Sequence, residues 1–287
     1  MNITVIGADG QLGSDICRSF KSNGDSVIEL TQNDIEISDY FSVNTVISKK
    51  LEADLVINTA AMHNLPQCEK DPASAFRVNG TGAINLANAC SDAGIPLLHI
   101  STDYVFDGEK SSPYTEYDQP NPLSVYASTK LSGEYFISSI SNNYFILRVS
   151  GIYGKNICMA KGYNFVDKML ELGKEKGVVR VVDDEILSPT FTEDIAAQII
   201  ELVRSKGKPG LYHVAAEGSC SWYEFAKEIF SIKGSDVKVE KAGPGEFANN
   251  INRPKYSVLE NKNLKDQGLN IMPHWKDGLK RYLTLYR

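Results

Sequence analysis

Apolar and polar positions along the first half of the chain alternate between short apolar runs and longer segments in which apolar residues recur at helical spacing. Such short runs predict strands that are buried in a parallel sheet. The five predicted strands are Asn2–Ile6, Ser26–Leu30, Leu55–Asn58, Ile95–Ile100 and Tyr144–Val149. Because these strands alternate with predicted helices, the pattern favours an α/β fold with a doubly wound parallel sheet.

Capping residues mark where several helices begin. Asp71 followed by Pro72 predicts the start of a long helix towards Ala93, and the segment from Ser221 to Glu224 is a capping box ahead of another helix. Further helices are predicted after Leu12, from Tyr126 to about Ile140, and over Asn164–Lys176, Thr192–Arg204 and Met272–Tyr286, with an extended segment at Val178–Val182.

The alternation of strands and helices becomes less regular after about Ser150, where the predicted strands are sparser and the loops longer. We therefore expect residues 1–150 to form a nucleotide-binding domain, to which residues 191–215 return. Residues 151–287 are expected to form a smaller, irregular α/β portion that binds the substrate. The sequence contains no internal repeat, low-complexity tract or flexible linker.

The first strand is followed by GADGQLG and a helical pattern, which together predict a phosphate-binding turn. Glycines allow the backbone to turn tightly and to approach a pyrophosphate at the helix amino terminus. The spacing G-x-x-G-x-x-G differs from the G-x-G-x-x-G of many dehydrogenases, and a plain strand-to-helix connection is the alternative. The position directly after the first strand favours dinucleotide binding. The candidate cofactor contacts here are Gly7, Asp9, Gly10, Gln11, Leu12 and Gly13.

The ends of the next two strands add candidate cofactor contacts. The second strand supplies Thr31, Asp34 and Ile35, of which the last two could flank an adenine. No acidic residue stands at that strand tip for free ribose hydroxyls and no arginine stands there for a 2′-phosphate. NADPH and NADH are therefore both candidate cofactors, with NADPH preferred. The third strand leads to Ala60, Ala61 and Met62, and the helix beyond it carries Asn79.

A third group of residues predicts proton transfer. Ser101 and Thr102 follow an apolar strand, and Tyr126 and Lys130 lie four residues apart on one face of a predicted helix. An ammonium near a phenol favours the phenolate, so we expect Lys130 to lower the pKa of Tyr126 into a range useful for acid–base work. An ordinary helix face is the alternative reading of Y-x-x-x-K taken alone. His63, just beyond the third strand, is either structural or a ligand contact.

Composition sets limits on partners and location. The 287 residues are 42% hydrophobic and carry a net charge of −6, with basic residues scattered rather than clustered. We expect no nucleic-acid partner, no membrane span and a cytoplasmic protein. The cysteines, which are Cys17, Cys68, Cys90, Cys158 and Cys220, are odd in number and lack C-x-x-C spacing. Buried thiols are expected, and neither a disulfide framework nor a zinc site is supported.

The most specific signal comes from seven segments that follow one another from Met1 to about Tyr282. They are GADGQLG, NTAA, STDYVFDG, NPLSVYASTK, LSPTFTEDIA, GLYHVAAEG and RPKYSVLENKNL. Together they resemble the dTDP-4-dehydrorhamnose reductase family of extended short-chain dehydrogenases. The resemblance implies a Rossmann-like sheet that binds NAD(P)H and a C-terminal portion that grips a nucleotide sugar. It also implies reduction of the C4 ketone of dTDP-4-dehydro-β-L-rhamnose to dTDP-L-rhamnose.

The resemblance implies roles for particular residues. Thr102, Tyr126 and Lys130 correspond to the family's catalytic residues: Tyr126 would donate the proton, Thr102 would hydrogen-bond the same oxygen, and Lys130 would hold the nicotinamide ribose. Asp103 and Tyr104 would touch the sugar or its phosphates. Arg253 would meet the diphosphate, a role that suits a planar fork of donors, and a surface arginine is the alternative.

Two departures from the family pattern concern the sugar pocket. Gly151 stands where an aromatic residue is usual, and the segment Met62–Pro66 replaces a tyrosine or histidine followed by Thr and an acidic residue. Gly151 and His63 are therefore candidate substrate contacts. Because of these departures, the sequence does not determine the identity of the sugar or of the nucleotide base.

Two other functions compatible with the resemblance are a non-catalytic subunit like the regulatory subunit of a methionine adenosyltransferase, and a nucleotide-sugar epimerase or dehydratase. The presence of Thr102, Tyr126 and Lys130 together favours an enzyme over a non-catalytic subunit. The C-terminal motifs disfavour an epimerase or dehydratase. Glu193 and Asp194 could bridge a homodimer through a metal or could simply start a helix. We assign no metal.

Overall fold

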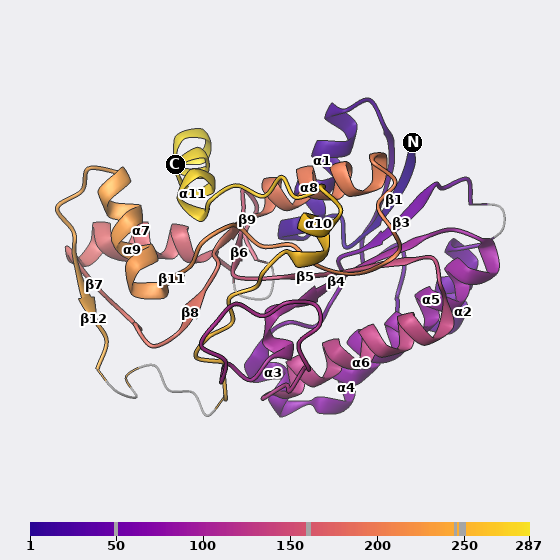
Figure 1. Ribbon diagram of the computed structural model, residues 1–287, viewed down its shortest axis with the longest axis horizontal. Coiled ribbons are helices and arrows are strands. Elements are labelled where there is room, and N and C mark those ends of the chain that lie inside the picture. Colours follow the sequence, from indigo (N-terminus) through magenta and orange to yellow (C-terminus); the bar gives the residue numbers. More distant parts are fainter. Residues whose placement is uncertain (49–50, 159–161, 244–245, 247–250) are drawn as a thin grey trace.

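The computed structural model describes residues 1–48, 51–158, 162–243, 246 and 251–287. Among these residues, a six-stranded parallel sheet forms the centre of the molecule (Figure 1). Its strands are β1 (Asn2–Ile6), β2 (Ser26–Leu30), β3 (Leu55–Asn58), β4 (Leu97–Thr102), β5 (Tyr144–Val149) and β10 (Gly210–His213), in the spatial order β10-β5-β4-β3-β1-β2. Every neighbouring pair is parallel, so the predicted fold class is confirmed.

Four of the five predicted strands have the predicted ends, and β4 differs. It begins and ends two residues later than predicted, because Ser101 and Thr102 still pair with Arg148 and Val149 of β5. The two hydroxyl residues are therefore the last residues of the strand rather than the start of a loop. β10 was not predicted as a strand.

Helices cover both faces of the sheet, as Figure 1 shows. α1 (Gln11–Ser22) and α8 (Thr192–Arg204) cover one face, and α2 (Tyr40–Val46), α5 (Gly82–Ala93) and α6 (Val125–Ile140) cover the other. Successive strand residues point to opposite faces, so Val5 packs in the cluster with Ile16 of α1, whereas Ile6 packs in the cluster with Leu86 of α5. The central strands of the sheet are thus buried on both sides. The sequence reading missed α2, whose first turn is capped by Asp39.

The order of the strands reverses between β1 and β3. From β1 the chain moves outward to β2, and it then crosses back to place β3 on the other side of β1. In open α/β sheets, ligands bind outside the carboxyl ends of the strands at such a switch point. The glycine turn after β1 and the small residues after β3 both lie there.

The predicted long helix after Asp71 is confirmed with a change in its middle. It consists of α4 (Pro72–Phe76), a π-helical segment η1 (Arg77–Thr81) and α5, and it ends at Gly94, whose φ is 73°. A π turn widens the helix and often marks a functional site. A short helix that was not predicted, α3 (Leu65–Lys70), precedes it.

The rest of the chain forms a smaller α/β region. Its helices are α7 (Phe165–Lys176), α9 (Trp222–Ile232), α10 (Lys262–Asp266) and α11 (Trp275–Tyr286). A separate 3-10 turn, η2 (Asp103–Val105), directly follows β4 of the large sheet. Its short strands pair as β6 (Ile152–Tyr153) with β9 (Thr190–Phe191), β7 (Val178–Val181) with β12 (Lys238–Lys241), and β8 (Ile186–Leu187) with β11 (Cys220–Ser221). Aromatic residues dominate its core, including Tyr153, Phe191, Phe225, Trp275 and Tyr282. The predicted capping box at Ser221 is confirmed, and the last helix starts three residues later than predicted.

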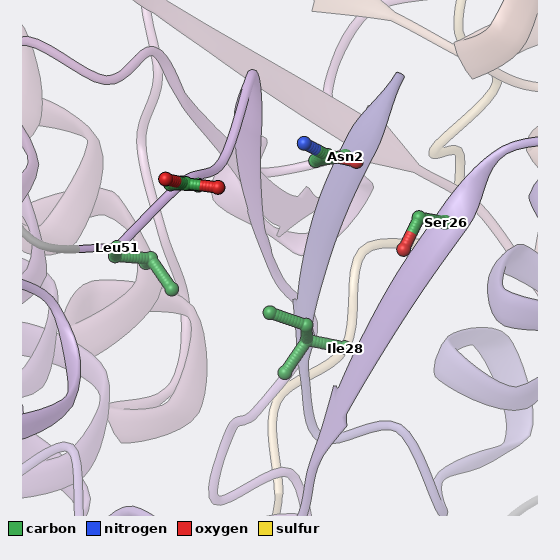
Figure 2. A pocket seen from close by; sticks show the side chains of 5 residues that line it. Asn2, Ser26, Ile28 and Leu51 are labelled. Atoms are coloured by element: carbon green, nitrogen blue, oxygen red, sulfur yellow. The ribbon is translucent and has the colours of Figure 1, made fainter.

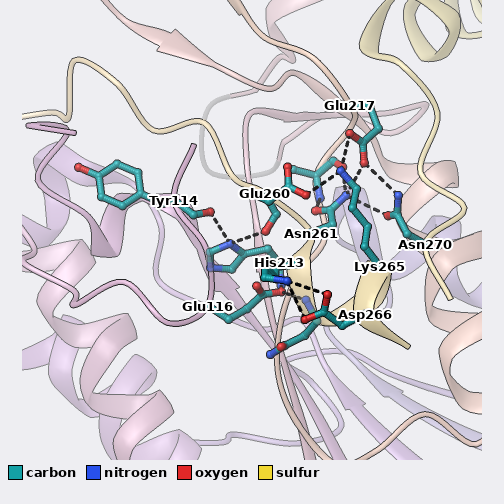
Figure 3. A network of polar contacts seen from close by, with 12 residues as sticks. Tyr114, Glu116, His213, Glu217, Glu260, Asn261, Lys265, Asp266 and Asn270 are labelled. Atoms are coloured by element: carbon teal, nitrogen blue, oxygen red, sulfur yellow. Dashed lines mark hydrogen bonds and ion pairs between the residues drawn. The ribbon is translucent and has the colours of Figure 1, made fainter. Parts of the chain in front are cut away.

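Polar contacts hold the loop with Tyr114 and Glu116, and the C-terminal segment, against β10 of the sheet (Figure 3). The backbone N–H of His213 donates to Glu116 Oε1 at 2.9 Å, and His213 Nδ1 lies 3.0 Å from the carbonyl oxygen of Tyr114 and 3.2 Å from that of Glu260. Two carbonyls can only accept, so Nδ1 carries the ring proton. Burial and, to a smaller extent, the Arg148 charge lower the pKa of His213 to about 3, so the ring is neutral.

A buried ion pair fixes α6 on the sheet. Arg148 Nη2 of β5 lies 2.6 Å from Glu134 Oε2 of α6, with the two side chains only 3% and 5% exposed. Ser101 of β4 donates to the other carboxylate oxygen of Glu134. Because a charge is costly to bury without a partner, these contacts restrict how α6 can lie on β4 and β5. No helix in the described ranges combines the length and apolarity needed to cross a bilayer.

Glu134→Ala is expected to lower the free energy of unfolding by about 3–5 kcal/mol, because it leaves the Arg148 guanidinium buried without its partner. Urea denaturation followed by circular dichroism measures the change. Glu171→Ala is the matched control, since Glu171 pairs with Lys168 at the surface and its loss should change stability little. Equal losses in the two variants would show that burial of the Arg148 pair does not matter.

Candidate active site

The candidate catalytic residues meet at the carboxyl edge of the sheet. Thr102 is the last residue of β4, and Tyr126 and Lys130 lie in the first two turns of α6. The Ser124 side chain caps this helix by accepting from the N–H of Ala127 at 3.3 Å. The Thr102 hydroxyl forms a hydrogen bond with the Tyr126 phenol. The structure therefore brings the threonine and the tyrosine together, with Lys130 one helical turn further along.

The environment of Tyr126 keeps its phenol protonated. Burial raises the pKa of Tyr126, and the hydrogen bond with Thr102 only partly offsets this rise. We predicted that Lys130 would lower this pKa, but its Nζ lies 3.0 Å from Nε2 of buried His99 instead. The protonated phenol is the form that a proton donor requires.

Lys130 is almost completely buried, with 2% of its surface exposed. Burial lowers its pKa to about 8, although the charge of Glu134 acts in the opposite direction. An amine with such a pKa can change its charge near neutral pH.

Asp103 joins three segments through its carboxylate. Its Oδ2 accepts from Ser257 Oγ at 2.6 Å and from Ser150 Oγ at 2.8 Å, and its Oδ1 accepts from Thr102 Oγ1 at 3.1 Å. Asp103 is only 3% exposed. Asp103 thus ties the ends of β4 and β5 to the RPKYS segment, and its predicted contact with the substrate stays a prediction.

Tyr104 and Arg253 lie on the same side of the site. The Tyr104 ring meets the Tyr126 ring edge-on, with the ring centroids 6.4 Å apart. Arg253 is close enough for its charge to lower the pKa of Tyr104, against the larger effect of burial, which raises it. Arg253 Nη1 also lies 3.8 Å from Glu185 Oε1, and Glu185 accepts from Trp222 Nε1 at 3.2 Å. The guanidinium is therefore held near Tyr104.

The glycine turn has the shape that a dinucleotide phosphate needs. Gly7 has a φ of 77°, and Gly10 is the N-cap of α1. A Cβ on Gly13 would collide with the carbonyl oxygen of Gly7, so only glycine allows this close turn. Gln11 is buried in the first turn, and its Nε2 has no hydrogen-bond partner among the described residues. This unused donor at a helix amino terminus fits an anionic group of a cofactor. Leu12 is buried in the core and Asp9 is exposed.

The residues after β2 are arranged differently from one another. Asp34 Oδ2 accepts from both the N–H and the hydroxyl of Thr31, each at 2.8 Å, which closes a small exposed turn. Ile35 is 3% exposed and packs with Ile37 in the core. Thr31 and Asp34 therefore lie at the surface of the crevice edge, and Ile35 lies beneath it.

Asn79 holds the segment after β3. Its Oδ1 accepts from the N–H of Met62 and its Nδ2 donates to the carbonyl of Met62, both at 2.9 Å, and Nδ2 also lies 2.9 Å from Thr129 Oγ1. This clamp comes from the π segment η1 and fixes the path of Ala60, Ala61 and Met62 across the strand ends. His63 follows, with Nε2 3.2 Å from Cys158 Sγ.

Gly151 has a left-handed backbone, with a φ of 51°, and a Cβ there would lie 2.5 Å from Leu187 Cδ1. A larger residue at this position would be strained and would meet Leu187. The departure from the family's aromatic residue is thus accompanied by a leucine that fills the adjacent space.

The sequence reading assigned no role to several residues that shape this site. They are Asn58, His99, Ser150, Glu185 and Ser257. A lone polar residue in an apolar strand, as His99 is, could have drawn attention. Ser150 and Ser257 could not have been recognised in this way, because their shared partner, Asp103, lies far from both in the sequence.

Other features of the described residues do not compete with this site. Figure 2 shows a pocket at the amino ends of β1 and β2, opposite the candidate site, lined by Asn2, Ser26, Ile28, Leu51 and Glu52. In the part of the chain that the structure describes, no group of three or more His, Cys, Asp or Glu side chains could hold a metal ion. Cys17, Cys68, Cys90 and Cys220 are buried, as predicted, whereas Cys158 is partly exposed.

The fold and the site define an oxidoreductase of the short-chain reductase class, because a Y-x-x-x-K helix and a strand-end threonine lie on the same sheet edge as a dinucleotide-type turn. The chain belongs to the RmlD substrate binding domain family, whose model matches residues 1–287. It is therefore an enzyme of the dTDP-4-dehydrorhamnose reductase type.

Three relatives illustrate this similarity. The spore coat polysaccharide biosynthesis protein SpsK of Bacillus subtilis (strain 168) is 39% identical over 98% of this chain and 96% of its own. A dTDP-4-keto-6-deoxy-D-glucose reductase of Streptomyces niveus is 34% identical over the same shares. The crystal structure of a dTDP-4-dehydrorhamnose reductase from Bacillus anthracis str. Ames in complex with NADP is 36% identical, with a TM-score of 0.93 over 99% of this chain and 98% of that one.

Asp103 makes the stability of the protein depend on pH. Burial raises its pKa from 3.8 to about 6. A carboxyl whose pKa is higher in the folded state stabilises the fold fully below its unfolded pKa, and that contribution is lost as the pH rises through about 6. Asp103→Asn mimics the uncharged form. From pH 4 to pH 8, the free energy of unfolding of the wild type should therefore fall by about 2–3 kcal/mol relative to that of Asp103→Asn.

Urea denaturation at pH 4, 6 and 8 measures this change. Asp107→Asn is the control of opposite sign, because backbone and side-chain hydrogen bonds from Glu109 and Asn121 lower the pKa of Asp107. A stability difference between wild type and Asp103→Asn that stays constant over this pH range would contradict the prediction.

Proposed function

We propose that this protein reduces the C4 ketone of a nucleotide-linked 4-keto-6-deoxy sugar with NADPH or NADH. The observation that carries this proposal is the convergence of Thr102, protonated Tyr126 and buried Lys130 at the strand edge that also holds the glycine turn. Dinucleotide and ketone would then meet at the switch point of the sheet.

The residues of this chain suit the proton transfer. When bound, the nicotinamide cofactor would supply hydride to the carbonyl carbon, so that negative charge would develop on the carbonyl oxygen. Tyr126 donates its phenolic proton to that oxygen. Thr102 donates a hydrogen bond to the same atom and so stabilises the developing charge. Lys130 orients the cofactor ribose from the adjacent helical turn.

The cofactor and substrate contacts follow from the placement of the other residues. The turn Gly7–Gly13 would hold the pyrophosphate, with Gln11 Nε2 as a donor, and Ala60 to Met62 would line the path of the dinucleotide. We favour NADPH, as in the complex of the Bacillus anthracis relative. Arg253 would meet the substrate diphosphate, while Asp103 and Tyr104 would line the sugar pocket.

The substrate that we favour is dTDP-4-dehydro-β-L-rhamnose, which would give dTDP-L-rhamnose. The name of the Streptomyces niveus relative suggests a second sugar of the same 4-keto-6-deoxy class. His63 and Gly151 are the residues that we expect to decide between such sugars, since they mark the two departures from the family pattern.

We further propose a cytoplasmic enzyme with a nucleotide-binding domain of residues 1–150 and a sugar-binding portion of residues 151–287. The packing of α8 on α1 and the pairing of β10 with β5 support the return of residues 191–215 to the first domain. A homodimer is compatible with this arrangement.

Tyr126→Phe is expected to reduce turnover by at least about a thousandfold while leaving the dissociation constant of NADPH within a few-fold, because the phenol acts mainly in the transition state. Oxidation of NADPH and of NADH, followed by absorbance with dTDP-4-dehydro-rhamnose generated in the cuvette, measures the reaction. Intrinsic fluorescence measures cofactor binding.

Tyr135→Phe is the matched control, because it also removes a phenolic hydroxyl from α6, but at an exposed position. This variant should behave like the wild type. Lys130→Ala should weaken both cofactor binding and turnover. If NADPH binds to the wild type and is not oxidised with any 4-keto sugar, the reductase proposal fails and a non-catalytic subunit becomes the better description.

A further inference from the structure

His99 is a buried polar residue that the proposed reaction does not use. It lies in β4, and register pairs it with Asn58 of β3. Its Nδ1 is 3.0 Å from Asn58 Nδ2, and its Nε2 is 3.0 Å from Lys130 Nζ. His99 is 1% exposed and Asn58 is 1% exposed. Both nitrogens of the ring are therefore in contact with a protein group, and one of these groups is the candidate catalytic lysine.

We propose that His99 is a positioning residue for Lys130: its Nε2–H donates a hydrogen bond to the Lys130 amine, fixes the direction of that amine and favours its uncharged form. The inference deepens the proposed function, on which its role in the reaction rests. The arrangement of hydrogen bonds around Asn58 carries it.

The orientation of the Asn58 amide determines which ring nitrogen of His99 carries the proton. The backbone N–H of Ala60 can only donate, and it lies 3.1 Å from Asn58, so the atom facing it must be the amide oxygen. The amide nitrogen then faces His99 Nδ1. Because that nitrogen can only donate, Nδ1 must accept, and a neutral imidazole then carries its proton on Nε2.

The consequence concerns Lys130. An Nε2–H can donate to a neutral amine, which has a lone pair, whereas an ammonium has none and would face this N–H with a hydrogen of its own. The contact therefore favours the neutral amine. His99 itself does not ionise here, because burial lowers its pKa well below the ordinary value.

The other groups around this pair are accounted for. Glu134 is the charged group on α6 that favours the ammonium, and its carboxylate is already paired with Arg148 of β5. β3 contributes only the neutral amide of Asn58. In this arrangement the charge of Lys130 beside Tyr126 is not fixed, because the amine changes its protonation near pH 8.

The test is an NMR titration of the whole protein without added ligand. The 13Cε signal of Lys130, assigned by its absence in Lys130→Arg, is followed against pH, and the ring 15N signals of His99 report which nitrogen is protonated. In the wild type we expect the Lys130 signal to titrate near pH 8 and Nε2 to carry the proton. In His99→Leu, the midpoint should rise by about 1 pH unit, which is a tenfold loss of neutral amine at a given pH.

Two further variants separate the proposed hydrogen bond from a general effect of packing. His99→Gln can again place an N–H next to the amine and should restore most of the wild-type midpoint. Asn58→Asp presents an acceptor to Nδ1, so it should move the ring proton to Nδ1 and raise the Lys130 midpoint while keeping the imidazole. Thermal melting confirms that each variant is folded.

Several results would overturn the proposal. These are a wild-type ring protonated on Nδ1, a midpoint that is unchanged or lower in His99→Leu, and a midpoint in His99→Gln that matches that of His99→Leu. The pH profile of kcat/KM gives a second readout, whose limb for Lys130 should move with the NMR midpoint. Since the titration needs no substrate, absence of reductase activity would contradict the proposed function and leave this test intact.

Discussion

Two ionisable side chains buried on one face of α6 constrain much of the site. Lys130 and Glu134 lie one turn apart on the helix, and each must find a partner because a buried polar or charged group without one is costly. Glu134 finds Arg148 and Ser101, and Lys130 finds His99. These contacts fix α6 against β4 and β5. The same placement brings Tyr126, at the start of the helix, to the end of β4.

A second set of buried polar contacts joins the C-terminal segment to this sheet edge. Asp103 accepts from Ser150 and Ser257, so the ends of two strands and the RPKYS segment meet at one carboxyl group. Arg253 belongs to the same segment and is thereby held near Tyr104, whose ring contacts that of Tyr126. A carboxyl buried in this way is less acidic than usual. The cost is acceptable because the hydroxyls of both serines satisfy one of its oxygens.

Much of the fold could be predicted from local patterns. Strand ends, the capping box at Ser221 and the helix Thr192–Arg204 depend on short-range apolar spacing and caps, which are visible in the sequence. The π segment Arg77–Thr81 and strand β10 were missed because they depend on long-range contacts. Asn79 in the π segment forms a hydrogen bond with Met62, which follows β3. β10 forms a strand because it pairs with β5.

By itself, the sequence determined the fold class, the glycine turn and the chemical types of the reacting residues, since each is encoded in a few neighbouring positions. Only the tertiary structure decided the ionisation of those residues. Lys130 was predicted to lower the pKa of Tyr126, but burial raises that pKa, and the Lys130 amine contacts His99 instead. The depth of a side chain and the partner it meets depend on segments far apart in the chain, and no spacing within one segment specifies them.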